Sequence, residues 1–147
     1  MNVRLAVEPF DPGVELSAFC ENRASTGAVA SFIGIARGEP GQGAALELEA
    51  YLGFTEVEIE NIVEGARLRF ALHDVRVVHR IGKIGVGEAI VLVMTASAHR
   101  RAALEACDFL IDYLKSKAPF WKREFSPSGP RWVEPTVQDF ADLSRWN

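Results

Sequence analysis

Hydrophobic positions along this chain follow two periods, and the longest helical pattern lies between residues 97 and 124. Apolar residues recur there at spacings of three and four, which is typical of one face of an α-helix. They are Ala103, Leu104, Cys107, Leu110, Ile111, Leu114 and Ala118. The pattern predicts an amphipathic helix from Arg100 to Lys117, about 27 Å long from the usual rise per residue. Pro119 ends it by disfavouring the α conformation at the preceding residue.

Phe109 projects almost opposite this apolar stripe, near Glu105 and Asp112. A solvated helix face rarely carries a phenylalanine among charged residues. We therefore expect either a second layer of the fold or a second subunit to cover Phe109.

Two shorter helices are predicted from their starting signals. An Asp-Pro pair at residues 11–12 is typical of an N-cap and a first helical residue, which predicts a helix running to about Arg23. Thr55 and Glu58 have the spacing of a capping box, and the helical pattern after them continues to Phe70.

Alternating or continuous apolar runs predict the strands. These strands span residues 3–7, 28–35, 46–51, 75–81, 89–96 and 131–134. The run at 89–96 does not alternate, which favours a strand buried on both faces. Glycine-rich segments at 38–43 and 82–88 predict a flexible loop and a turn. The order β, α, β, β, α, β, β, α, β predicts an α+β fold, with helices packed on a mixed sheet.

The length of 147 residues suits one domain with a single core, and the sequence contains no internal repeat or dividing linker. We expect this domain to span residues 1–134. Residues 135–147 carry Phe140, Leu143 and Trp146 among polar residues, which favours a C-terminal tail that is either docked or frayed.

The composition is that of an ordinary soluble protein, with 48% hydrophobic and 24% charged residues. The first residues contain no apolar run of signal-peptide length, and we expect a cytoplasmic location. Two cysteines, Cys20 and Cys107, lack metal-ligand spacing and are interpreted as structural. The sequence predicts neither a metal site nor a cofactor.

Charge is unevenly distributed along the chain. The net charge of −4 argues against general nucleic-acid binding, whereas residues 99–124 carry +2 and leave −6 for the remainder. The basic residues that we combine into a candidate pocket are Arg37, His99, Arg100, Lys115, Lys122 and Arg123. Arginine offers a fixed fork to phosphate or carboxylate, and the pKa of a buried lysine falls among other cations. Such a pocket would bind a phosphate, stabilise an oxyanion and move protons, but it has no sulfur nucleophile.

Three local features have two interpretations each. His79 lies in an alternating strand, where a packed structural role is favoured over that of a base. The glycines of residues 38–43 lack the ending of a phosphate-binding loop, so a flexible connection is favoured over a phosphate cradle. Phe120 and Trp121 either stack on a flat heterocycle or anchor the loop that carries Lys122, and the anchoring role is favoured.

Several longer motifs resemble those of one family. They are Gly34-Ile35-Ala36-Arg37, His79-Arg80-Ile81-Gly82, His99-Arg100, Asp112-Tyr113-Leu114-Lys115, Ala118-Pro119-Phe120-Trp121-Lys122-Arg123-Glu124 and Arg131-Trp132-Val133-Glu134. In this order they resemble the large, catalytic subunit of molybdopterin synthase, the MoaE family, over roughly residues 3–134. The resemblance implies an α/β-hammerhead-like fold and a homodimer.

The resemblance also implies a reaction. Members of that family convert cyclic pyranopterin monophosphate to molybdopterin by installing two sulfurs as a dithiolene, a step of molybdenum cofactor biosynthesis. The sulfur arrives as a thiocarboxylate on the C-terminal Gly-Gly of a small ubiquitin-like subunit, so this chain needs no cysteine for the chemistry. The expected assembly is a heterotetramer, in which a homodimer carries two small subunits.

The resemblance also implies site residues, at the positions of this sequence that match the family motifs. Lys115 and Lys122 are the expected catalytic residues, placed to orient the thiocarboxylate, stabilise the acyl intermediate and shuttle protons. The expected substrate-binding residues are Ile35, Ala36, Arg37, His99, Arg100, Lys115, Lys122, Arg123 and Glu124. Arg37, His99 and Arg100 are assigned to the phosphate and the pterin, while Arg123 and Glu124 have an internal ion pair as their alternative. Thr136 is left out of the site, because some relatives have a basic residue there.

Two functions of other classes compete with this one. The chain could be a non-catalytic module that captures an anion or an extended C-terminal peptide. The presence of both lysines together with Arg37 and the His99-Arg100 pair argues against that. Weak nucleic-acid binding through the basic helix ends conflicts with the acidic net charge.

Overall fold

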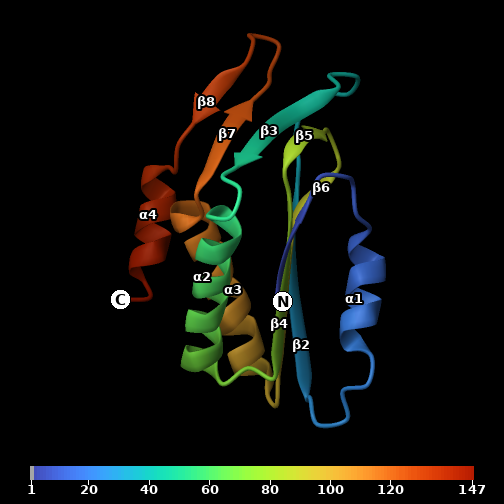
Figure 1. Cartoon of the computed structure of the whole chain (residues 1–147), viewed down its shortest axis with the longest axis vertical. Coiled ribbons are helices and arrows are strands. Elements are labelled where there is room, and N and C mark those ends of the chain that lie inside the picture. Colours follow the sequence, from blue (N-terminus) through green and yellow to red (C-terminus); the bar gives the residue numbers. More distant parts are fainter. Residues whose placement is uncertain (1) are drawn as a thin grey trace.

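Two sheets and four helices make up the structure, a computed structural model that describes residues 2–147 (Figure 1). The first sheet has the strand order β1 (Val3–Ala6), β4 (Asp74–Arg80), β6 (Ala89–Ser97) and β2 (Ala28–Ile35). The second has the order β5 (Gly82–Gly85), β3 (Ala44–Ala50), β7 (Phe120–Glu124) and β8 (Arg131–Val133). The helices are α1 (Pro12–Cys20), α2 (Thr55–Phe70), α3 (Arg100–Lys117) and α4 (Val137–Ser144). The predicted α+β class is therefore confirmed.

The first sheet is covered on both faces, with α2 and α3 on one side and α1 on the other (Figure 1). Strand β6 lies inside this sheet and alternates between the two cores. Val91 and Val93 face α2 and α3, whereas Leu92 and Met94 pack with Phe19 of α1. The prediction of a strand buried on both faces is thus confirmed, since the β6 residues from Val91 onward are buried.

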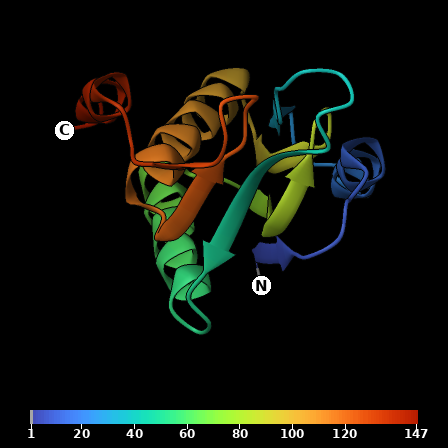
Figure 2. The same cartoon turned by 90° about the horizontal axis from the view of Figure 1, so that it is seen from above.

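The second sheet lies at one end of the first, and β3 and β7 run side by side in it (Figure 2). Two of its strands correct the sequence prediction. Residues 82–85 were predicted as a turn but form β5, and residues 120–124 were predicted as a loop but form β7. Both strands pair with β3, which is far away in sequence. The glycines and charged residues of β5 and β7 give no apolar pattern that would predict a strand. Main-chain hydrogen bonds to β3 stabilise both strands instead.

Helix α2 has the predicted bounds but not the predicted cap. Phe54 occupies the N-cap position and makes no side-chain cap. The Thr55 hydroxyl instead accepts from the Tyr51 N–H at 2.8 Å and donates to the Pro119 carbonyl at 2.9 Å. The buried threonine therefore connects the start of α2 to the segment between α3 and β7.

Helix α3 also keeps its predicted bounds, but its buried face is rotated relative to the predicted stripe. Leu104 is 53% exposed, whereas Phe109 is 5% exposed. Phe109 contacts Phe70 of α2 and Trp146 near the C-terminus, with ring centroids 5.4 and 5.5 Å apart. We expected either a second layer of the fold or a second subunit to cover Phe109. In the structure, a second layer of the same chain covers it.

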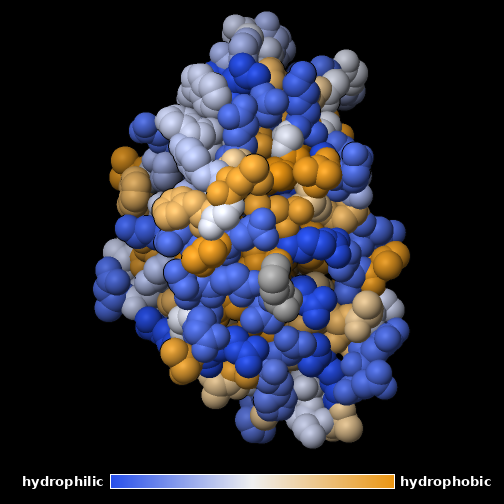
Figure 3. Space-filling view, in the orientation of Figure 1, coloured by the Kyte–Doolittle hydropathy of each residue, from blue (hydrophilic) through white to orange (hydrophobic). Residues whose placement is uncertain are grey.

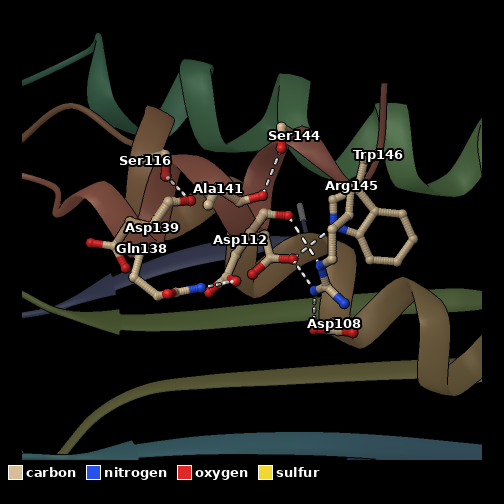
Figure 4. A network of polar contacts seen from close by, with 10 residues as sticks. Asp108, Asp112, Ser116, Gln138, Asp139, Ala141, Ser144, Arg145 and Trp146 are labelled. Atoms are coloured by element: carbon tan, nitrogen blue, oxygen red, sulfur yellow. Dashed lines mark hydrogen bonds and ion pairs between the residues drawn. The ribbon is translucent and has the colours of Figure 1, made fainter.

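The C-terminal segment is docked rather than frayed. Thr136 and Asp139 form a capping box that starts α4. Beyond this helix, Arg145 and the indole N–H of Trp146 donate to the buried Asp112 carboxylate of α3, at 2.5 and 2.7 Å (Figure 4). The segment thus packs on α3, and the domain boundary at residue 134 stays a prediction.

We predict that Phe109→Ala lowers the free energy of unfolding by about 3–5 kcal/mol, because it opens a cavity between α2, α3 and Trp146. Leu104→Ala is the matched control on the same helix and should cost less than about 1 kcal/mol. Chemical denaturation of both variants measures the difference. Equal losses would contradict the orientation of α3 described above.

Candidate functional site

Three of the predicted basic residues, Arg37, Lys115 and Lys122, lie together where the second sheet meets the C-terminal end of α3. Arg37 follows β2 and is fixed by its neighbour Ala36, which is buried. The Ala36 N–H donates to the Glu88 carbonyl at 2.9 Å, and its own carbonyl accepts from the Gly87 N–H at 2.8 Å. Arg37 itself is exposed.

The two lysines stand on either side of a tight connection. Lys115 lies in the last turn of α3, and Lys122 lies in the middle of β7 opposite Leu48 of β3. Between them the Phe120 N–H donates to the Ala118 carbonyl at 3.0 Å, which closes the turn around Pro119. We call Arg37, Lys115 and Lys122 the lysine cluster.

The charges of the cluster change the acid–base chemistry of Lys115. Partial burial lowers the pKa of this lysine, and the positive charges of Lys122 and Arg37 lower it further. The negative charges of Asp139 in α4 and Glu124 in β7 raise the Lys115 pKa, but the net effect is still a lowered pKa. The Lys115 amine is consequently neutral more often near neutral pH than an ordinary lysine, which suits a group that moves protons.

Glu124 is the acidic neighbour of the cluster on β7. Its carboxylate lies 3.7 Å from Lys122 Nζ and 3.5 Å from Arg131 Nη2. Arg123 differs, because successive side chains of a strand point to opposite faces. It projects to the outer face of the second sheet, pairs with Glu47 at 2.5 Å and lies over the Trp132 ring at 5.4 Å. The proposed internal ion pair between Arg123 and Glu124 is therefore wrong.

His79 is the residue whose position sequence reasoning missed. It is buried at the end of β4, hydrogen-bonded through Nδ1 to the Arg80 carbonyl at 2.8 Å, and stacked on Phe120 with 4.4 Å between centroids. The predicted packed role is confirmed. However, burial and the charges of Lys115 and Lys122 lower its pKa to about 4, while the bond to Arg80 opposes them. A neutral imidazole thus lies beside the lysine cluster.

The aromatic pair before Lys122 divides between the core and the surface. Phe120 stacks on His79 and is part of the anchor, as predicted. Trp121 points to the outer face of the sheet, is 53% exposed and contacts Tyr51 and Trp132. Exposed apolar side chains also gather where β3 leads into α2, a region that Figure 3 shows in orange. They include Tyr51, Leu52, Phe54 and Val57.

His99 and Arg100 do not join the lysine cluster within one chain. They lie at the N-terminal end of α3, and about 27 Å of helix separates them from Lys117. Both are exposed. Ile35, at the Arg37 end of β2, is 50% exposed, whereas the side chain of Ala36 is buried and both its main-chain groups are hydrogen-bonded. The predicted site is therefore divided between the two ends of the molecule.

Other kinds of site find little support in the structure. Two open hollows of about 370 and 500 Å³ do not include the lysine cluster. The first is lined around His73, and the second is lined around Phe10 and includes the predicted site residue Ile35. Burial raises the pKa of the Cys107 thiol to about 12, so it is no nucleophile, while Cys20 is exposed.

Within residues 2–147, no three His, Cys, Asp or Glu side chains gather closely enough to bind a metal ion. No helix in this range is both long and apolar enough to cross a membrane.

Comparison with known proteins places this arrangement in a family. A family model described as "MoaE protein" matches residues 5–117. The chain belongs to the MoaE family. A curated relative from Caulobacter vibrioides is 62% identical over 147 residues, covering 100% of this chain and 98% of the relative. One from Mesorhizobium japonicum is 49% identical, covering 98% of this chain and 92% of the relative. Both relatives are named molybdopterin synthase catalytic subunit.

Solved structures agree with the family. The MoaE protein from Burkholderia ambifaria has a TM-score of 0.82 at 41% identity, covering 99% of this chain and 97% of that one. Molybdopterin synthase from Staphylococcus aureus has a TM-score of 0.79 at 28% identity, covering 90% and 97%. The expected family fold is thus confirmed along nearly the whole MoaE chain.

We predict that Lys122→Met raises the pKa of Lys115, because it removes a positive charge that disfavours the ammonium form. Carbon-13 NMR of labelled lysine side chains measures this pKa directly. Lys117→Met is the matched control, since Lys117 is not among the charges that act on Lys115. An unchanged pKa in the Lys122 variant would show that the two lysines are not coupled.

Proposed function

We propose that this chain transfers sulfur from the thiocarboxylated C-terminus of a small ubiquitin-like subunit to cyclic pyranopterin monophosphate, with the lysine cluster as its catalytic centre. The product is the dithiolene of molybdopterin. Family membership and the curated relatives identify the activity as that of a molybdopterin synthase catalytic subunit, a sulfurtransferase of molybdenum cofactor biosynthesis. The observation that carries the proposal is the grouping of Lys115 with two other cations, Lys122 and Arg37, where burial and both charges lower the Lys115 pKa.

The chemistry of the reaction matches these groups. The substrate phosphate and the thiocarboxylate are both anionic, and attack on the acyl group develops an oxyanion. Lys122 and Arg37 supply positive charge for these anions, while the lowered pKa of Lys115 lets its amine give up a proton more readily than an ordinary lysine. Sulfur comes with the partner, which agrees with the inert, buried Cys107.

We propose the following residue roles. Lys115 and Lys122 orient the thiocarboxylate and stabilise the acyl intermediate, and Arg37 binds the phosphate. Glu124 stays in the proposed site as the carboxylate that pairs with Lys122. Arg123 has a weaker claim, because its guanidinium is engaged by Glu47 on the opposite face of β7.

A second copy of the chain would complete the site. Strand β2 is an edge strand that begins beside Ser97, next to His99, and ends next to Arg37. Antiparallel pairing of β2 with β2 of a second copy would bring His99 and Arg100 of that copy toward Arg37. Four apolar residues of β2 are exposed and available for such pairing: Val29, Phe32, Ile33 and Ile35. We therefore propose a homodimer with two composite sites, each served by one small subunit.

The competing function is a module that binds an anion or a peptide without turnover. Such a module needs positive charge but gains nothing from a lysine with a lowered pKa, because a neutral amine binds anions less well than an ammonium. The acid–base state of Lys115 therefore favours catalysis.

We predict that Lys115→Ala lowers kcat for dithiolene formation by at least about 10³-fold, because charge stabilisation and proton transfer are lost together. The assay combines cyclic pyranopterin monophosphate, a thiocarboxylated small subunit and this chain. Lys117→Ala, two residues away in the same last turn of α3, is the control and should keep nearly full activity. Similar rates from both variants would remove Lys115 from the mechanism, and no product from the unaltered chain with the small subunit bound would support the binding module.

A further inference from the structure

The His79 ring is held in one orientation and one protonation state. Phe120 stacks on it at an interplanar angle of 26°, which fixes the plane of the ring. Nδ1 lies 2.8 Å from the Arg80 carbonyl, and a carbonyl only accepts hydrogen bonds, so Nδ1 carries the proton. Nε2 of the neutral ring is consequently an acceptor with a free lone pair. No donor within residues 2–147 forms a hydrogen bond with Nε2.

The surroundings of this acceptor are cationic. Phe120 and Lys122 are two residues apart on β7 and therefore project from the same face of that strand, about 7 Å apart along it. Lys115 is carried by the end of α3, which is joined to β7 by only two residues. The charges of both lysines act on His79, that of Lys115 more strongly. The ring thus lies beside the lysine cluster, and the Lys115 charge acts on it more strongly than the Lys122 charge.

We propose that His79 is a positioning residue for Lys115: its Nε2 accepts a hydrogen bond from the Lys115 amine, directly or through one bridging water. This inference rests on the catalytic role proposed for Lys115. It assigns to His79 a function beyond packing, because the fixed tautomer presents a neutral acceptor beside two lysine amines that can donate.

The choice of a neutral acceptor has a physical reason. A carboxylate in place of the ring would also bind the Lys115 amine, but its negative charge would favour the ammonium form and raise the lysine pKa. Imidazole orients the amine without that charge, and burial among lysines prevents the ring from becoming protonated. The remaining charges that face Lys115 are Lys122 and Glu124 of β7, Asp139 of α4 and Arg37 after β2.

The test compares two substitutions of His79 that differ in the acceptor. His79→Gln keeps a neutral acceptor near the position of Nε2, whereas His79→Leu removes it. We expect the pKa of Lys115, measured by carbon-13 NMR, to stay unchanged in the Gln variant and to fall by about one pH unit in the Leu variant, because the ammonium form loses its acceptor. The pH–rate profile should shift toward lower pH in the same order, with kcat falling about tenfold or more only in the Leu variant. His73→Gln, at an exposed histidine, is the control.

A Lys115 pKa that is equal in the wild-type and Leu proteins would overturn the proposal, because a purely structural histidine leaves that pKa unmoved. The pKa readout needs no turnover, so it is separable from failure of the proposed reaction, which appears as absence of product from the wild-type chain. Should the Leu variant fail to fold, nitrogen-15 NMR of the intact protein decides. An Nε2 signal typical of an unprotonated nitrogen at neutral pH supports the assignment, and a protonated Nε2 contradicts it.

Discussion

The hydrogen bond from Thr55 to the Pro119 carbonyl fixes the connection between α3 and β7, and the candidate site depends on that connection. Pro119 joins the end of α3 to the start of β7, so its position determines how far Lys115 lies from Lys122. Thr55 is fully buried at the start of α2, and the same hydroxyl accepts from Tyr51 at the end of β3. Three elements that meet at one threonine thereby hold the two lysines in place.

The opposite end of α3 is anchored in a similar way. Thr95 of β6 donates to the Ala103 carbonyl at 2.7 Å, and Phe109 packs against α2 in between. A helix fixed at both ends acts as a spacer, with basic residues displayed at each end. Its length explains why one chain cannot unite them, and the proposed pairing of two copies through the edge strand β2 would bring them together.

Local signals were sufficient for much of the fold. The bounds of α3 and β2 follow from apolar periodicity and from Pro119, and the structure has both as predicted. Strands β5 and β7 escaped prediction, because their pairing with β3 is a long-range interaction that leaves little trace in composition. Leu104 was wrongly predicted to lie on the buried face of α3 for a related reason. Spacing defines an apolar stripe on the helix, but packing against α2 decides which edge of that stripe is buried.

The site was less accessible from sequence than the fold. Arg37, Lys115 and Lys122 were among six basic residues combined into one candidate pocket, and spacing alone gave no reason to separate these three from His99 and Arg100. Arg123 was assigned to the site from the family motif, whereas strand alternation sends its side chain to the other face of β7. The position of His79 beside the lysines depends on its stacking with Phe120. This contact joins the two sheets and cannot be seen in either segment of the sequence alone.

The most direct test of this account is a purified mixed dimer, in which one copy carries Lys115→Ala and the other carries His99→Ala with Arg100→Ala. If each site combines the lysine cluster of one copy with the basic helix end of the other, one of the two sites stays intact. The mixed dimer should then show about half of the wild-type activity, although each variant alone is inactive. Activity as low as that of the separate variants would contradict a site shared between two copies.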